Sequence, residues 1–263
     1  IYGGGTNPDI DQILAAGFNT CGPMMGFTGD WLDECLRKGL WVVGGLHGFF
    51  PNHNIDGAVA FVNQWKHHPA IGAWFFIDEP TMHASYTKEL QQTWYNRLKA
   101  ADPSRDFLTN FTSNVQDRYN PNAFNHCSVD CYPFNDECFR YGAGEWNGNY
   151  KGYIKYCIDR WNSQTNNIGG MATVQAFWHL PEYLDPTGHV GDMLAKFQEL
   201  GVGTQKDGYA MYIWSEVPGG YGVVQNTALF NHVKAVNASY NWPHAPPGEE
   251  VVYTCPYCGA TFS

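Results

Sequence analysis

Two adjacent carboxylates, Asp78 and Glu79, directly follow a largely apolar run of the sequence. The run covers residues 71–77, and Pro80 comes after the acids, where a residue without a backbone N–H ends a strand. Acids at the rim of a hydrophobic pocket lose hydration, which raises the pKa of a carboxyl group. A carboxyl that keeps its proton near neutral pH can act as a general acid, so this stretch predicts acid–base chemistry.

Two other acids follow later apolar runs and are candidates for a second carboxylate. Asp130 stands in the stretch Ser-Val-Asp-Cys-Tyr-Pro, and Glu216 stands in Trp-Ser-Glu-Val-Pro. Across a pocket from Glu79, a separation of about 6.5 to 9.5 Å would leave room for an attacking water, whereas roughly 5 to 5.5 Å implies a covalent intermediate. Acids at strand ends also cap helices or form ion pairs, and for Asp78 a positioning role is favoured over direct chemistry.

A further set of polar and aromatic side chains stands at or just after the ends of apolar runs. Amides, carboxylates and imidazoles bond sugar hydroxyls, and aromatic rings stack on the C–H face of a sugar. The same residue types also occur at strand ends as ordinary packing, so both interpretations stay open. Glycines at positions 44, 45 and 48 would allow a ligand to approach the backbone closely. The candidates for substrate binding are His47, Asp78, Asn110, Tyr132, Gln175, Trp178 and Trp214.

Eight short runs of apolar or β-branched residues alternate with segments of helical spacing, which is the pattern of a (β/α)₈ (TIM) barrel of the α/β class. Catalytic groups of such barrels lie where the strands end, as the acids above do. An open doubly wound sheet is the alternative, but Gly3-Gly-Gly-Thr lacks the spacing of a dinucleotide-binding loop. The expected strands are 1–4, 18–21, 40–46, 71–77, 107–110, 127–131, 172–177 and 209–214. The expected helices are 8–16, 30–38, 56–67, 86–101, a short one near Val115, 150–161, 190–200 and 227–238, with Thr28 or Asp30 and Asn54 as caps.

The sequence Asp78-Glu79-Pro80 resembles the acid/base strand of the clan of retaining glycosidases that includes cellulases and β-galactosidases, whose fourth strand ends in Asn-Glu. It also resembles glycosidase-like barrels that carry Asp-Glu-Pro at this place and Asp-x-Tyr-Pro after the sixth strand, as Asp130-Cys-Tyr-Pro does here. The resemblance implies a glycoside hydrolase with Glu79 as general acid/base and Asp130 as nucleophile or base.

The resemblance fails at the end of the seventh expected strand. That clan places its nucleophilic Glu there, whereas this sequence has Gln175. A neutral amide cannot form the glycosyl intermediate, so either Asp130 or Glu216 supplies the second carboxylate, or the pocket binds sugar without cleaving it. The alternative to a glycosidase is therefore a catalytically silent TIM-barrel module that binds carbohydrate or serves a structural role.

The composition favours a neutral ligand. With 25 acidic and 15 basic residues the formal net charge is −10, which leaves no basic stripe for a nucleic acid. The low charged fraction of 15% and the aromatic fraction of 16% suit an oligo- or polysaccharide, a substrate that favours an extracellular or cell-surface location. No stretch approaches 18 apolar residues, so no membrane span is expected. No cofactor is expected for catalysis.

The end of the chain differs in composition from the rest. Residues 1–240 are expected to form the barrel, 241–252 a linker and 253–263 a tail. In the tail, Cys255-Pro-Tyr-Cys258 resembles the first knuckle of a zinc ribbon, and two thiolates would supply half of a tetrahedral zinc site. A structural zinc ion and an ordinary thiol pair or disulfide both stay open, because C-x-x-C alone does not separate them. The tail is also a candidate attachment element for a protein partner.

Overall fold

The computed structural model describes the greater part of the chain. The described residues are 2–4, 7–23, 26–80, 85–115, 117–135, 148–165, 170–179, 184–204, 209–212, 220–239, 253–254 and 261–262.

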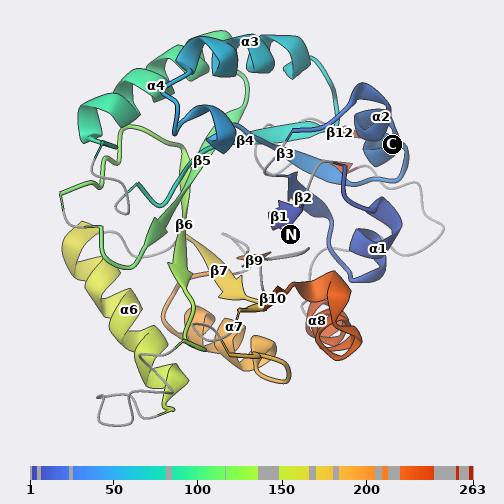
Figure 1. Cartoon of the computed structure of the whole chain (residues 1–263), viewed down its shortest axis with the longest axis vertical. Coiled ribbons are helices and arrows are strands. Elements are labelled where there is room, and N and C mark those ends of the chain that lie inside the picture. Colours follow the sequence, from blue (N-terminus) through green and yellow to red (C-terminus); the bar gives the residue numbers. More distant parts are fainter. Residues whose placement is uncertain are drawn as a thin grey trace.

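The strands of the main sheet are parallel and lie side by side in chain order. Figure 1 shows the sheet curled around a central axis, with helices outside it. The last strand also pairs with the first, at the single position Tyr2 with Tyr212. The strands are β1 (Tyr2–Gly4), β2 (Thr20–Pro23), β3 (Trp41–Gly45), β4 (Ile71–Asp78), β5 (Asp106–Thr112), β6 (His126–Cys131), β7 (Met171–Gln175) and β9 (Tyr209–Tyr212).

Helices alternate with these strands, so the predicted α/β class is confirmed. Thr28 caps α2 by accepting a hydrogen bond from Trp31 N at 3.4 Å, and Asn54 caps α3 through Gly57 N at 3.0 Å. No helix in the described residues is long and apolar enough to cross a membrane. The helices are α1 (Ile10–Ala15), α2 (Gly29–Arg37), η1 (His47–Phe49), α3 (Ile55–Trp65), α4 (Lys88–Ala101), α6 (Tyr150–Thr165), α7 (Val190–Glu199), η3 (Val223–Gln225) and α8 (Thr227–Ser239).

The helix expected near Val115 does not form in the described residues between β5 and β6. Side chains bond the backbone of this connection instead. Val115 N donates to Gln164 Oε1 at 2.8 Å, and Asn120 Oδ1 accepts from Asn122 N at 3.1 Å. Asn120 Nδ2 also donates to Lys88 O at 3.0 Å, which fastens the connection to the start of α4. These contacts provide partners for polar groups that a helix would otherwise pair internally.

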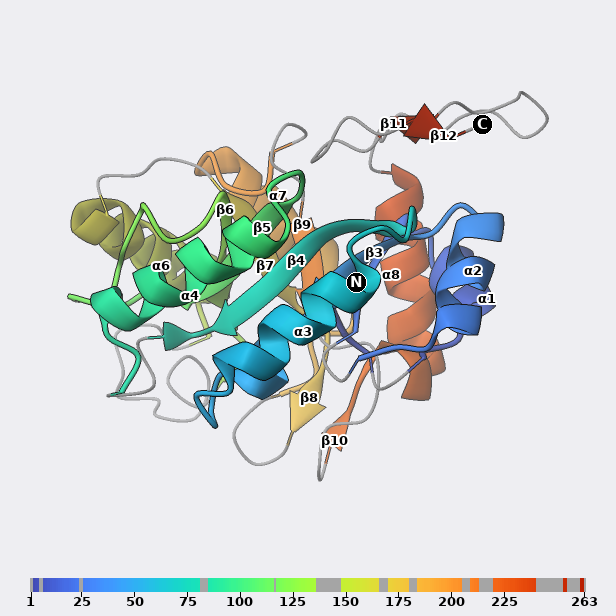
Figure 2. The same ribbon diagram turned by 90° about the horizontal axis from the view of Figure 1, so that it is seen from above.

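Two short antiparallel pairs stand apart from the main sheet. β8 (Trp178–His179) pairs with β10 (Gly220–Tyr221), and β11 (Tyr253–Thr254) pairs with β12 (Thr261–Phe262). Because β8 begins shortly after β7 ends, the first pair lies at the end of the sheet where the strands finish, and Figure 2 shows it projecting there.

Side chains of β4 alternate between two environments. The ring of Trp74 packs against Phe61 of α3 with the ring centroids 6.4 Å apart, and Phe76 packs against Tyr95 of α4 at 6.5 Å. These side chains belong to an outer cluster between the sheet and the helices. The β4 side chains that alternate with Trp74 and Phe76 belong to a second cluster. This cluster contains residues of strands only, so these side chains face the inside of the curled sheet. The members of this inner cluster are Val43, Ala73, Phe75, Leu108 and Met171.

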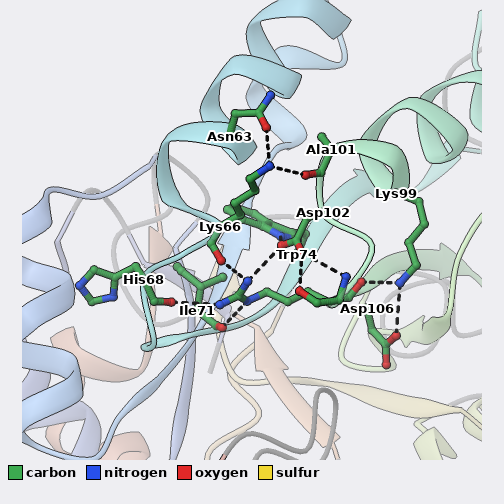
Figure 3. Close-up of polar contacts among 11 residues, drawn as sticks. Asn63, Lys66, His68, Ile71, Trp74, Lys99, Ala101, Asp102 and Asp106 are labelled. Carbon is green, nitrogen blue, oxygen red and sulfur yellow. Dashed lines mark hydrogen bonds and ion pairs between the residues drawn. The ribbon is translucent and has the colours of Figure 1, made fainter.

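Trp74 is fixed by a buried polar network at the start of β4 and β5, shown in Figure 3. Its indole Nε1 donates to Asp102 Oδ2 at 2.8 Å, and Arg105 Nη1 reaches the same oxygen at 3.2 Å. Arg105 also donates to Ile71 O at 2.7 Å and to His68 O at 3.2 Å, which fastens the segment that enters β4. Burial by itself raises the pKa of Asp102. The hydrogen bond from Trp74 and the charge of Arg105 lower the pKa by more than burial raises it, so the carboxylate stays ionised.

The ring of Trp74 occupies the space beside Gly44 of β3. A Cβ atom at Gly44 would lie 2.4 Å from Cζ3 of Trp74, closer than real Cβ atoms approach other heavy atoms. The expectation that this glycine admits a ligand is therefore wrong, because the tryptophan fills the room that the glycine leaves.

We expect Gly44→Ala to lower the free energy of unfolding by about 1–3 kcal/mol, because a ring held by Asp102 cannot move aside without strain. Urea denaturation followed by tryptophan fluorescence measures the change. Gly48→Ala is the matched control, since a Cβ there has no heavy atom within 4 Å. Equal stability of the two variants would contradict the prediction.

Candidate active site

One extra residue in β4 turns Asp78 toward the inside of the curled sheet. The register with β5 advances two residues on β4, from Phe75 to Ile77, for one residue on β5. Under strict alternation Ile77 would follow Ala73 and Phe75 inward, and Asp78 would face the helices. Instead Ile77 is buried in the outer cluster, and Asp78 Oδ1 accepts a hydrogen bond from Asn110 Nδ2 at 3.0 Å. Such β-bulges re-aim side chains, and they are common next to active sites.

The side chain of Asn110 connects the ends of four strands. Its Nδ2 donates to Asp78 Oδ1 at 3.0 Å and to Asp130 Oδ2 at 2.5 Å. Its Oδ1 accepts from Ser128 Oγ at 2.6 Å and from Thr173 Oγ1 at 3.3 Å. The residue was predicted to bind substrate, and the structure places it among the acids, with its amide bonded to protein groups on both sides.

Glu79 leaves β4 in an unusual backbone conformation. Its φ of 41° lies in the left-handed region, which costs a non-glycine residue about 1–3 kcal/mol. A hydrogen bond from Glu79 N to Asn110 O at 2.9 Å holds the backbone there. The half-buried side chain of Glu79 lies within hydrogen-bonding reach of the Asp130 carboxyl. Two predicted catalytic acids from different strands are therefore in direct contact.

Burial and mutual repulsion favour the protonated forms of both acids. Burial raises the pKa of Glu79 from 4.5 to about 7, the charge of Asp78 adds to the rise, and the hydrogen bond with Asp130 opposes it. Burial also raises the pKa of Asp130 well above its usual range, with contributions from the charges of Glu79 and Asp78, against the hydrogen bond from Asn110. Two carboxyls in contact at this depth do not both ionise near neutral pH, so the pair holds a proton.

An aromatic wall stands beside the acids at the ends of β6, β7 and β9. Tyr132 and Tyr212 are stacked with ring centroids 5.9 Å apart, and Phe177 packs edge-on against them at 5.3 and 5.5 Å. Burial raises the pKa of the Tyr132 phenol, and the charges of Asp130 and Glu79 raise it further. Tyr132, a predicted substrate-binding residue, thus lies close enough to the acids for their charges to raise its pKa, and its phenol keeps its proton.

Gln175 ends β7, at the place where the glycosidase clan carries its nucleophile. Its side chain is fully buried and bonds backbone groups of two connections. Oε1 accepts from Phe134 N at 3.0 Å, and Nε2 donates to Phe177 O at 3.1 Å and to Leu184 O at 3.3 Å. The amide therefore ties the segment after β6 to the segment after β7.

The other predicted site residues are described in part or not at all. His47 follows β3 and begins η1, and the backbone of Trp178 belongs to β8. The predicted residues outside the described part of the chain are Trp214, Glu216, Cys255 and Cys258. Within the described ranges, no group of three or more His, Cys, Asp or Glu side chains could hold a metal ion. The roles of Glu216 and of the tail cysteines, zinc binding included, stay predictions.

Sequence reasoning missed Ser128, Thr173 and Tyr212. The available signal was alternation, because Ser128 lies two residues before Asp130, and Thr173 lies two residues before Gln175. Residues two apart on a strand share a face, so hydroxyls at these positions point the same way as the acid and the amide that follow them.

Comparison with known proteins finds similarity of structure only. No protein-family model matches the sequence, and no curated protein matches it. A β-glucuronidase from Ruminococcus gnavus in complex with D-glucuronic acid superposes with a TM-score of 0.64 at 14% identity, over 90% of this chain and 49% of that chain. A GH2 β-galacturonidase from Eisenbergiella tayi bound to galacturonate gives 0.63 at 14% identity, over 88% and 46%. A β-glucuronidase from Lactobacillus rhamnosus gives 0.61 at 12% identity, over 90% and 49%.

The chain thus has a glycoside hydrolase-like fold and spans about half the length of these glycosidases. At such low identity the likeness concerns the fold alone, and the sugars named belong to those proteins.

The acid pair predicts how stability changes with pH. A carboxyl whose pKa is raised in the folded state binds its proton more tightly there than in the unfolded chain, so stability falls as pH rises between the two values. We expect the free energy of unfolding to fall from pH 4.5 to about 7, the range over which the pKa of Glu79 is raised, and Glu79→Gln to remove only part of this fall, because the pKa of Asp130 is raised as well. Urea denaturation at several pH values measures it.

The control is Glu34→Gln, since hydrogen bonds from Arg37 and Lys38 lower the pKa of that carboxyl to about 2. The control variant should keep the decline above pH 4.5. A wild-type protein whose stability is flat across this range would show that the pair holds no extra proton.

Proposed function

We propose that this chain is the (β/α)₈ catalytic domain of a glycoside hydrolase, with Glu79 as the general acid that protonates the leaving-group oxygen. The observation that carries the proposal is the close carboxyl pair of Glu79 and Asp130, whose raised pKa values favour a shared proton near neutral pH. The pair stands at the strand ends, where barrel enzymes carry their chemistry. The glycosidase-like fold of the neighbours supports a carbohydrate as the ligand.

Between the two acids, Glu79 is the better proton donor. Its side chain is half-buried and its pKa of about 7 matches neutral conditions, whereas Asp130 is 6% exposed and is bonded to Asn110. A group that must reach a substrate oxygen needs an open side. Asp130 then acts behind Glu79, as the group that shares and returns the proton.

Because the carboxyls of Glu79 and Asp130 lie within hydrogen-bonding reach of each other, a sugar carbon or a water does not fit between them. We therefore propose Asp130 as the proton partner of Glu79 in place of the expected nucleophile or base. Glu216 is the proposed second carboxylate, which attacks the anomeric carbon or activates a water according to its distance from Glu79.

The charge of the site favours a neutral sugar. Three acids, Asp78, Glu79 and Asp130, meet at one place. Asn110 bonds Asp78 and Asp130, and its amide carries no charge. A uronic acid would bring a further carboxylate to this place, and juxtaposed like charges cost several kcal/mol. The aromatic wall of Tyr132 and its neighbours suits the C–H face of a neutral ring.

Glu79→Gln should lower kcat for glycan hydrolysis by about 100-fold or more, because glutamine keeps the size of the side chain and cannot donate an acidic proton. Release of reducing ends from a responsive glycan measures it. Glu89→Gln on α4 is the control for a neutralised acid outside the site, with activity expected at the wild-type level. Unchanged hydrolysis by the Glu79 variant would remove it from the mechanism.

A second candidate function is a catalytically silent carbohydrate-binding module. The observation that favours it is Gln175, since the nucleophile position of the clan is occupied by an amide bonded to backbone groups. A glycan panel assayed for both binding and cleavage separates the two functions, because a silent module binds sugar and releases no reducing ends.

If the acid cluster selects neutral sugars, an aryl glycoside should be cleaved with a kcat/KM at least about tenfold higher than the matching aryl uronide. The two substrates differ only at C6, and they must share ring stereochemistry and anomeric configuration. Asp78→Asn removes one negative charge and should narrow the ratio. A preference for the uronide would contradict the proposed substrate class.

A further inference from the structure

We propose that Asn110 is the positioning residue of the acid pair and does not bind the sugar: its amide holds Asp78 and Asp130 from one side, so that a single proton is held between Asp130 and Glu79. The consequence for hydrolysis rests on the function proposed above, but the position of the proton does not.

The amide of Asn110 has no hydrogen-bonding capacity left for a ligand. A carboxamide offers two N–H hydrogens and an oxygen with two lone pairs. The hydrogens go to Asp78 and Asp130, and the oxygen accepts from Ser128 and Thr173. The amide orientation follows from these partners, since hydroxyls that donate to one end leave the other end facing two carboxylates. A sugar hydroxyl would have to displace one of these bonds.

Asn110 also lies deeper than the acids that it bonds. Asn110 is 3% exposed, and Thr173, which supports it, is 2% exposed. The half-buried side chains of Asp78 and Glu79 are more accessible than the amide. A ligand at the strand ends therefore meets the acids before it meets Asn110.

The surroundings of Asp130 also favour a shared proton. Asn110 donates to Oδ2, while Oδ1 is buried and receives no hydrogen from any donor in the described part of the chain. The contact with Glu79 becomes a hydrogen bond only if one of the two carboxyls carries a proton. A proton shared by the pair removes the repulsion between two anions.

Other ionisable groups also act on this proton. The charge of Asp78 raises the pKa of both members of the pair, and the Tyr132 phenol lies near all three acids. Tyr212 of β9 in turn acts on Tyr132. The hydrogen bond from Asn110 stabilises the ionised form of Asp130, so its removal should let the pair hold the proton to a higher pH.

The test is ¹³C NMR titration of the aspartate and glutamate carboxyls in the whole chain, for the wild type and Asn110→Leu. Leucine has a similar volume, keeps water out and cannot donate. We expect the upper titration of the pair to move upward by about one pH unit, the size of one lost hydrogen bond to a charged group. In hydrolysis the variant should lower kcat and move the basic limb of the pH profile by the same amount, with KM changed less than threefold.

Two further variants control the result. Ser128→Ala keeps the amide but removes the 2.6 Å bond that orients it, so the titration should move in the same direction by a smaller amount. Thr109→Val removes a buried hydrogen bond of the neighbouring residue, to Ile77 O at 2.8 Å, and should leave the titration unchanged. If Asn110→Leu does not fold, the Ser128 and Thr109 variants decide the question.

Unshifted titration in both Asn110→Leu and Ser128→Ala would overturn the proposal. A tenfold rise in KM at constant kcat would overturn it in favour of a sugar-binding role. If the wild type hydrolyses no glycan in the panel, the proposed function fails, and the NMR titration still determines whether Asn110 positions the pair.

Discussion

The register of β4 is the constraint on which the site depends. A strand has a period of two, so one extra residue between Phe75 and Ile77 exchanges the faces of every residue after it. Before the bulge the inner face is apolar and fills the inside of the sheet. After it, Asp78 turns inward beside Asn110 and Ile77 turns to the outer cluster. The same strand thus supplies a packed interior at one end and an acid at the other.

Placing acids on the inner face has an electrostatic cost that the neighbouring strands offset. Asp78, Glu79 and Asp130 repel one another where water is scarce, and each ionised carboxylate needs donors. Asn110 supplies two N–H groups, and hydroxyls of Ser128 and Thr173 fix the amide. The remaining repulsion is removed by a proton, which is the same property that general-acid chemistry requires.

Much of the fold could be predicted from the sequence, because the spacing of apolar residues and the helix caps are local signals. Apolar runs predicted the parallel strands, and Asn54 was recognised as a cap because its side chain bonds the first turn of α3. The bulge was not predictable, since Phe75, Phe76 and Ile77 are all apolar and carry no alternation that could reveal a slip. The segment near Val115 was misjudged because distant side chains, such as Gln164, bond its backbone.

Among the site residues, too, some could be predicted from the sequence and others could not. Glu79 could be found because an acid after an apolar run is unusual, whatever its neighbours are. The roles of Asn110 and Gln175 could not be predicted, because the sequence does not show whether an amide bonds sugar hydroxyls, carboxylates or backbone groups. Gln175 also bears on the electrostatics: a glutamate there would bury another anion among backbone carbonyl oxygens, where the amide donates to Phe177 O and Leu184 O instead. The neutral amide at the end of β7 thus suits the close packing of these two connections, and the acids that the structure describes at the site lie on or directly after β4 and β6.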